Sequence, residues 1–181
     1  MRLLNPASHK AGLAPGTLVP EKDSIGRLPV YVSLVDYSRD VYYPEQTVDL
    51  HNITEQPPDC IRLVIVNGVH DTEKMALIGD TLNLHSLILE DIVNTGHPMK
   101  LEKWEEHEFL ILKTLFEHSK TAKATFNQVS LLVGEKQVIV FHEGRRVFLE
   151  PILKRLETGK GRIRKSGSGY LAYAIMDSIV D

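Results

Sequence analysis

The chain has 181 residues and carries 21 lysines and arginines against 24 aspartates and glutamates, which gives a formal net charge of −3. Charged residues make up 25% and hydrophobic residues 43% of the sequence, close to the averages for soluble globular proteins. This composition excludes a disordered tail, a collagen-like fibre and a generally basic nucleic-acid binder.

The cysteine content and the apolar runs narrow the class of protein further. The single cysteine, Cys60, excludes a disulfide scaffold and a zinc site built on Cys-x-x-Cys pairs. No apolar run approaches the roughly 20 residues that cross a bilayer, and no signal peptide opens the chain. We therefore expect a soluble, cytosolic protein.

The first half of the chain predicts two strands followed by two helices. Residues 1–25 are rich in Pro, Gly, Ala and Ser, so we expect a loosely ordered N-terminal segment. Residues 28–34 have strand composition, and residues 41–50 show no clear pattern. Residues 61–66 (IRLVIV) form a continuous apolar run, typical of a central strand buried on both faces. Asp71 or Thr72 can cap a first helix that continues to about residue 84, and a shorter helix starts after His85-Ser86 and runs until Gly96.

The second half predicts three more strands and two more helices. We expect strands at residues 108–116, 128–133 and 137–141, and the short connection between the last two suits an antiparallel hairpin. A helix over residues 147–157 ends at Gly159, a basic, glycine-rich linker spans residues 159–169, and a last helix begins at Tyr170. A β-core with helices before and after it is typical of an α/β or α+β fold with a mixed sheet.

The last helix is still apolar and periodic when the sequence stops at Asp181. Apolar residues continue at helical spacing through Ile175, Ile179 and Val180. Natural helices usually end in a cap rather than in the middle of such a pattern. We therefore expect the chain to be a piece of a longer protein.

Two helices carry acidic side chains on their polar faces. On a helical wheel, Glu90 and Asp91 lie on the two flanks of the arc opposite the apolar residues, so both can project outward. On the last helix, Asp177 and Asp181 share the face that the apolar residues leave free. Such carboxylates suit Mg²⁺, a hard cation that takes oxygen ligands and needs only one or two direct carboxylates. The alternative is that these acids only solvate surface helices.

The other candidate sites in the sequence are weaker. The eight histidines form no HExxH or other metal-ligand spacing. The linker at residues 160–167 lacks the phosphate-loop spacing and joins two helices, so we expect it to be structural, with nucleic acid or anionic lipid as an alternative ligand. No nucleophile-elbow motif appears, so we predict no catalytic residues, and a free-standing α/β enzyme that uses an acidic pair stays an alternative.

Residues 84–94 (LHSLILEDIVN) are the most specific stretch of the sequence. Together with residues 15–19 (PGTLV), 66–70 (VNGVH), 128–132 (QVSLL), 163–165 (IRK) and 170–181, in this order, they resemble the CorA magnesium-transporter family, whose members carry LHPLVLEDILN at residues 84–94. Two features depart from the family pattern. The central strand lacks the usual tryptophan, and the proline of the His-x-x-Pro-Lys motif is displaced in His97-Pro98-Met99-Lys100.

The resemblance implies the cytosolic N-terminal domain of such a transporter. Its fold would be an α/β/α sandwich with a mixed parallel and antiparallel sheet over residues 26–165, and residues 166–181 would begin a long helix leading to a stalk and two transmembrane helices. Members of the family are pentamers, in which Mg²⁺ between neighbouring cytosolic domains holds the channel closed. By position, the ligands would be Glu90, Asp91 and Asp177, together with an aspartate on the neighbour's stalk helix.

From this resemblance we expect a regulatory domain that senses divalent cations at the cytoplasmic face of the inner membrane. Regulatory Mg²⁺ would bind weakly, the transported ion would be Mg²⁺, Co²⁺ or Ni²⁺, and the chain would not be an enzyme. The same domain of a ZntB-like zinc transporter is the alternative. The full-length protein would be a homopentamer that does not bind nucleic acid, whereas this chain alone would be monomeric or weakly associated.

Overall fold

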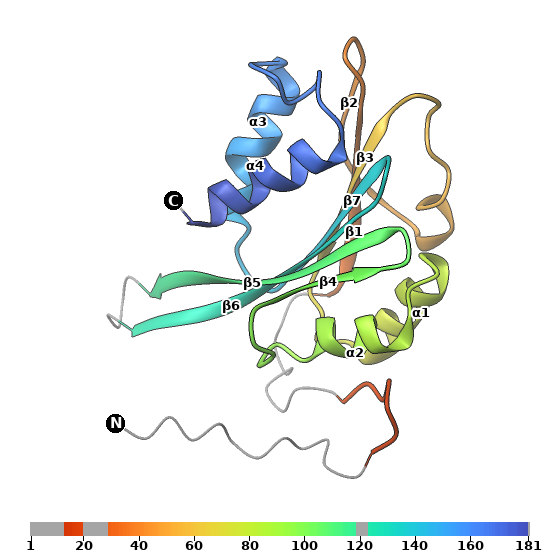
Figure 1. The fold of residues 1–181 in the computed structure, drawn as a ribbon, viewed down its shortest axis with the longest axis vertical. Coiled ribbons are helices and arrows are strands. Elements are labelled where there is room, and N and C mark those ends of the chain that lie inside the picture. The colour runs from red at the N-terminus through yellow and green to blue at the C-terminus, as the bar shows by residue number, and fades with distance from the viewer. Residues whose placement is uncertain (1–12, 20–28, 119–122, 181) are drawn as a thin grey trace.

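The computed structural model describes residues 13–19, 29–118 and 123–180. Most of the N-terminal segment that the sequence predicts to be loosely ordered lies outside these ranges, as does Asp181. Within them, the chain forms seven strands, four α-helices and two short 3₁₀ helices (Figure 1).

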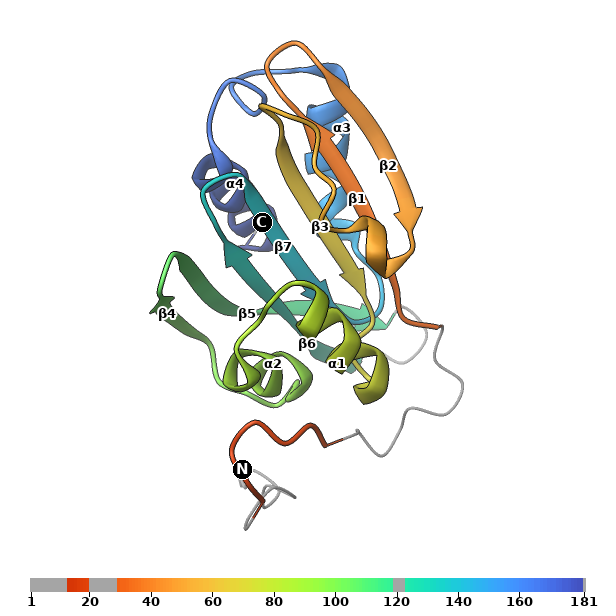
Figure 2. The same ribbon diagram turned by 90° about the vertical axis from the view of Figure 1, so that its right-hand side faces the viewer.

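All seven strands belong to one sheet. They are β1 (Tyr31–Tyr37), β2 (Tyr42–Val48), β3 (Ile61–Asn67), β4 (Lys100–Trp104), β5 (His107–His118), β6 (Lys123–Val133) and β7 (Gln137–His142). Their order across the sheet is β2-β1-β3-β7-β6-β5-β4, so β2 and β4 form its two edges (Figure 2). β3 and β7 pair in parallel, whereas the other neighbours pair antiparallel. The prediction of an α/β fold with a mixed sheet is therefore confirmed.

Helices cover both faces of this sheet. They are α1 (Thr72–Thr81), α2 (Ser86–Val93), α3 (Glu150–Thr158) and α4 (Ser168–Val180), with the 3₁₀ helices η1 (Leu50–Asn52) and η2 (Val147–Leu149). One hydrophobic cluster joins α1 and α2 to one face of the sheet, and a second joins α3 and α4 to the other. Figure 1 shows the two helix pairs on opposite sides of the strands. The result is three layers, as the α/β/α prediction requires.

The central strand β3 places buried apolar side chains on both faces of the sheet. Leu63 and Ile65 belong to the cluster with α3 and α4, and Val64 and Val66 belong to the cluster with α1 and α2. Side chains alternate between the faces of a strand, so a continuous apolar run places apolar groups on both. The predicted central strand is thus confirmed, and so is the hairpin that joins β6 to β7.

Two predicted helix ends are confirmed, whereas α2 ends at Val93 with Asn94 as its C-cap, before the predicted stop at Gly96, and α4 begins at Ser168, before Tyr170. Asp71 caps α1, because its side chain accepts a hydrogen bond from the Lys74 N–H. α3 ends at Gly159, which adopts the left-handed conformation (φ +65°) that favours glycine. No helix in the described ranges has both the length and the apolar character needed to cross a membrane.

Candidate metal site

The apolar residues of α2 determine where its acids lie. Ile88, Leu89, Ile92 and Val93 are buried against the sheet. The C-terminal end of the helix is fixed by Gln128 of β6, whose Nε2 donates to the carbonyls of Asp91 (3.0 Å) and Ile92 (3.2 Å). Because these carbonyls have no partner within the helix, a side-chain donor at this point stabilises the helix end. Glu90 and Asp91 are thereby held at a defined place beside the sheet.

Glu90 is half-buried and contacts the N-terminal segment of the chain. Its Oε2 accepts a hydrogen bond from the Gly16 N–H at 2.7 Å. Gly16 lies in a turn with φ +82°, and a Cβ at this position would lie 2.9 Å from both Cβ and Oγ of Ser86. The turn therefore needs glycine for its backbone conformation and for its close approach to α2. Glu90 anchors residues 13–19 across the first turns of this helix.

Asp91 forms ion pairs with residues that follow α2. Its Oδ2 lies 2.6 Å from Lys100 Nζ, and its Oδ1 lies 3.3 Å from His97 Nε2. Lys100 Nζ also lies 2.9 Å from Glu102 Oε2, which accepts a hydrogen bond from Trp104 Nε1. Burial lowers the pKa of the Lys100 ammonium, but its hydrogen bonds to Asp91 and Glu102 outweigh burial and raise the pKa above its usual value. Lys100 is therefore a cation held between two carboxylates.

Asp177 lies on the opposite side of the sheet from these groups. The buried residues of α4, among them Leu171 and Ile175, pack on the sheet, and Asp177 is exposed. Ser168 Oγ donates to the carbonyl of Gly134 at 2.6 Å, and Ser178 Oγ donates to the carbonyl of Phe148 at 2.8 Å. These two hydrogen bonds fix the position of α4 at both ends, so Asp177 has a defined place on the outer surface.

A single chain does not assemble the predicted acids into one site. Glu90 and Asp91 are neighbours on α2, but both turn toward partners in their own chain instead of projecting freely outward. Asp177 is separated from them by the sheet. No group of three or more His, Cys, Asp or Glu side chains in the described part of the chain could hold a metal ion. The oxygen donors fit Mg²⁺ chemically, but one chain alone does not provide their convergence.

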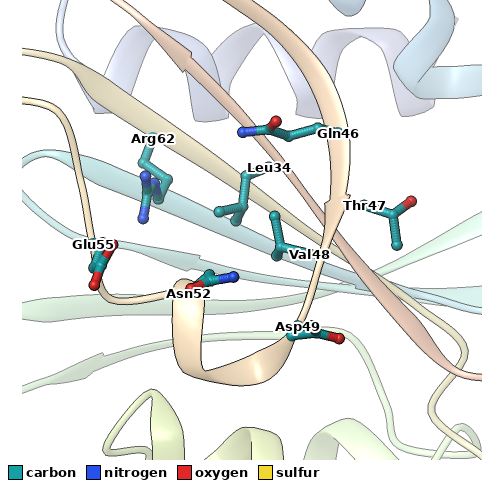
Figure 3. A pocket seen from close by; sticks show the side chains of 8 residues that line it. All are labelled: Leu34, Gln46, Thr47, Val48, Asp49, Asn52, Glu55 and Arg62. Carbon is teal, nitrogen blue, oxygen red and sulfur yellow. The ribbon is translucent and has the colours of Figure 1, made fainter.

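A hollow beside the edge strand β2 is a separate feature (Figure 3). It has a volume of about 480 Å³ and is lined by Leu34, Gln46, Thr47, Val48, Asp49, Asn52, Glu55 and Arg62. The Arg62 guanidinium is already bound, because it lies 2.7 Å from both carboxylate oxygens of Asp36 and donates to the Ile53 carbonyl. The hollow therefore presents no available cation for an anionic ligand and contains none of the predicted site residues.

The basic linker is structural, as the sequence predicts. Arg164 donates to the carbonyls of Leu156 and Glu157, the last turn of α3, and its guanidinium lies 4.9 Å from the centre of the Tyr42 ring. The Arg162 guanidinium lies 5.5 Å from the centre of the Tyr170 ring. Two of the four basic side chains of the linker, those of Arg162 and Arg164, thus contact other parts of the same chain.

Comparison with known proteins links these observations to a family. Residues 64–181, more than half of the chain, match the family model described as CorA-like Mg²⁺ transporter protein. The chain belongs to the CorA-like family. The family predicted from the sequence is thus confirmed, and Glu90, Asp91 and Asp177 all lie within the matched residues.

Two CorA proteins, one similar in sequence and one similar in structure, align with most of the chain. The cobalt/magnesium transport protein CorA of Thermotoga maritima is 29% identical over 175 residues, which are 96% of this chain and 49% of that protein. The complete structure of the CorA magnesium transporter from Methanocaldococcus jannaschii shares the fold with a TM-score of 0.61 at 16% identity, over 84% of this chain and 45% of that one. The chain thus spans about half the length of these two CorA proteins.

A cytoplasmic domain with a different name shares the fold as well. The ZntB cytoplasmic domain from Vibrio parahaemolyticus has a TM-score of 0.60 at 10% identity, over 84% of this chain and 58% of that one. At this identity the likeness supports the fold alone. The matched family and the Thermotoga relative are transport proteins, in agreement with the prediction that this CorA-like chain is not an enzyme.

Sequence reasoning missed the partners of the CorA acids. It noted Gly16, Lys100 and Gln128 only as parts of the resemblance, and it did not mention Glu102. Gly16 and Glu90 are far apart in sequence, so no local pattern connects them. Lys100, in contrast, follows Asp91 closely in the sequence. Because a short loop after a helix returns the chain beside the last helical turn, this short separation could have predicted the ion pair.

Proposed function

We propose that this chain is the cytosolic regulatory domain of a CorA-type divalent-cation channel, and that it senses Mg²⁺ through acids at the contacts between subunits. Family membership supports the transport of Mg²⁺ or of a similar ion such as Co²⁺ or Ni²⁺. In the full-length protein the domain would lie at the cytoplasmic face of the inner membrane, within a homopentamer and attached to the membrane helices of the longer chain.

The observation that carries this proposal is the placement of the acids on opposite faces of the sheet. Glu90 and Asp91 lie on α2, and the exposed Asp177 lies on α4 across the sheet. Opposite faces of one domain meet when copies pack head to tail, because each copy then presents a different face to each neighbour. A ring of this kind would bring α2 of one subunit toward α4 of the next and gather carboxylates at every contact.

Such a contact would respond to the concentration of cations. Two like charges 4 Å apart repel by roughly 1 kcal/mol in water, and by more where they are partly buried. Mg²⁺ bound to carboxylate oxygens of Glu90, Asp91 and Asp177 would supply charge neutralisation across the contact. When cytosolic Mg²⁺ falls, repulsion between the acids would favour separation of the subunits, and we propose that this separation opens the channel.

The test replaces the acids in the full-length transporter and measures protection from proteolysis as Mg²⁺ is added. Asp91→Ala should move the midpoint of protection to about tenfold higher Mg²⁺, which corresponds to about 1.4 kcal/mol of lost binding free energy. Asp177→Ala should act in the same direction but less strongly. Asp91→Lys should fail as Ala does if the contact needs oxygen ligands, because an ammonium group offers only donors. Conduction should persist in all three, since the pore lies elsewhere.

A matched control and a second ion complete the experiment. Asp80 is an exposed acid at the end of α1, on the same side of the sheet as α2, and Asp80→Ala should leave the midpoint unchanged. The same titration with Zn²⁺ tests the ZntB-like alternative. Equal protection of the wild type and Asp91→Ala would show that Asp91 does not bind the regulatory ion.

A further inference from the structure

Both oxygens of the Asp91 carboxylate contact cationic or ring-nitrogen groups of the same chain. Lys100 Nζ lies 2.6 Å from Oδ2, and His97 Nε2 lies 3.3 Å from Oδ1. The Asp91 side chain is 21% exposed, so solvent reaches this pair only in part. An ammonium group at this distance makes a charge-assisted hydrogen bond, the stronger class of such bonds. Any other cation that binds Asp91 must therefore compete with an existing one.

Lys100 is held in place more firmly than a typical surface lysine. It is the first residue of β4 and pairs with Ile111 of β5 across the sheet. Its side chain is 17% exposed, and Nζ lies 5.2 Å from the centre of the Phe109 ring. Nζ also lies 2.9 Å from Glu102 Oε2, so a second carboxylate holds the same ammonium. The Lys100 side chain is thus already ordered in the folded chain.

We propose that Lys100 is a built-in competitor for divalent cations at Asp91, and that it thereby sets the Mg²⁺ affinity of the regulatory site. This inference rests on the function proposed above. An ion on Oδ2 of Asp91 would lie within a few ångströms of the ammonium, and two positive charges at that separation repel. The ammonium must therefore leave Asp91 when the ion binds, and the free energy of the Lys100–Asp91 pair is subtracted from that of ion binding.

Glu102 keeps this competition moderate. Because the ammonium already contacts Glu102, it can keep this carboxylate as its partner when it leaves Asp91. The exchange then loses one contact instead of leaving a partly buried charge unpaired, which would be much more costly. A site that is weakened but not abolished in this way suits a cation present at high concentration.

The test measures the same Mg²⁺ midpoint of protease protection in full-length variants at position 100. Lys100→Met keeps an apolar stem of similar length and removes the charge, and we expect the midpoint to fall about fivefold, the upper range for a partly exposed ion pair. Lys100→Gln should shift the midpoint in the same direction and guards against a packing defect specific to methionine. Lys100→Arg keeps the charge and should stay close to the wild type.

Lys103 offers a matched control on the same strand. Its side chain is exposed, and Lys103→Met removes the same net charge from β4. We expect no shift in the Mg²⁺ midpoint for this variant. A shift as large as that of Lys100→Met would mean that overall charge sets the affinity, and it would overturn the inference.

A second measurement requires no metal. With divalent cations chelated, we compare the unfolding temperatures of the wild type, Asp91→Asn, Lys100→Met and the double variant. This double-mutant cycle isolates the interaction between Lys100 and Asp91. We expect the double variant to unfold at about the temperature of the less stable single variant, because both changes remove the same contact. Strictly additive shifts would show that the pair does not form, and would overturn the inference.

The outcomes separate this inference from the proposed function. In one outcome, Asp91→Asn loses protection while Lys100→Met and Lys100→Gln leave the Mg²⁺ midpoint unchanged or raise it. This result would keep the regulatory site and overturn the role of Lys100. Identical Mg²⁺ responses of the wild type and Asp91→Asn would overturn the proposed function, and the competition with it.

Discussion

At the scale of single residues, His142 makes the stability of the protein depend on pH. It ends β7, is 1% exposed, and lies with its ring edge-to-face against Phe148. Burial, assisted by the nearby Arg146, lowers its pKa from 6.5 to about 4. Between these two values the unfolded chain binds a proton that the folded chain does not, so folding becomes less favourable as the pH falls from 6.5 toward 4.

This pKa difference gives a measurable loss of stability. Lowering the pH from 7 to 5 should remove about 2 kcal/mol of the free energy of unfolding through His142. His142→Gln should show a correspondingly smaller loss, whereas the matched change at the exposed His51 should leave the loss as in the wild type. Urea unfolding at the two pH values measures both. A loss in His142→Gln as large as in the wild type would show that other groups cause it.

The candidate site could be predicted from the sequence only in part, and the reason lies in single residues. Helical periodicity correctly separates Glu90 and Asp91 from the buried side of α2. It cannot show that Gly16 donates to Glu90, or that Lys100 pairs with Asp91, because both partners come from segments outside the helix. Position on a helix is thus predictable from local sequence, whereas the partner of a charge depends on the tertiary fold.

At the scale of elements, α3 and the basic linker form one unit. The Arg164 guanidinium donates to the carbonyls of Leu156 and Glu157 in the last turn of α3, where carbonyls lack the usual helical partner, and the Leu156 carbonyl also accepts a long backbone hydrogen bond of 3.4 Å from Gly159. A cation at a helix C-terminus also interacts favourably with the helix dipole. We therefore expect Arg164→Ala to lower the free energy of unfolding by about 1–2 kcal/mol. Chemical denaturation of the purified chain measures this change.

Lys165 provides the control for this prediction. It lies in the same linker and is exposed, so Lys165→Ala should change the free energy of unfolding by less than about 0.5 kcal/mol. Equal effects of the two substitutions would mean that the linker acts through its charge alone. The structural interpretation of the linker would then be wrong.

The two edge strands are the elements that the sequence does not predict. β2 contains Pro44 and is exposed along much of its length, and β4 consists largely of charged and exposed residues. Edge strands gain their order from hydrogen bonds to one neighbour, β1 for β2 and β5 for β4, and need no apolar alternation. The buried strands β3 and β7 are recognisable because burial imposes an apolar pattern on them.

At the scale of the whole molecule, the sheet separates two surfaces that local sequence cannot relate to each other. The order of the elements along the sequence predicts a mixed sheet with helices. Which face of the sheet each helix covers depends on the crossover between β3 and β7. This crossover carries α1 and α2 to one face, and α3 and α4 cover the other. Asp177 and the α2 acids are therefore separated within one chain, and only contact between chains can bring them together.

This separation predicts how subunits can be linked covalently. In a full-length chain whose native cysteines, Cys60 among them, are replaced by Ala, we introduce Glu90→Cys and Asp177→Cys together and add a short thiol-specific cross-linker. If α2 of one subunit faces α4 of the next, every chain is joined to two neighbours, and a ladder of products up to the closed ring should appear on a denaturing gel. Each single variant should give no ladder, because one reactive position cannot join a chain on both sides. Dimers from the single variants would instead show a two-fold contact, in which each face meets its own copy, and would rule out the head-to-tail arrangement.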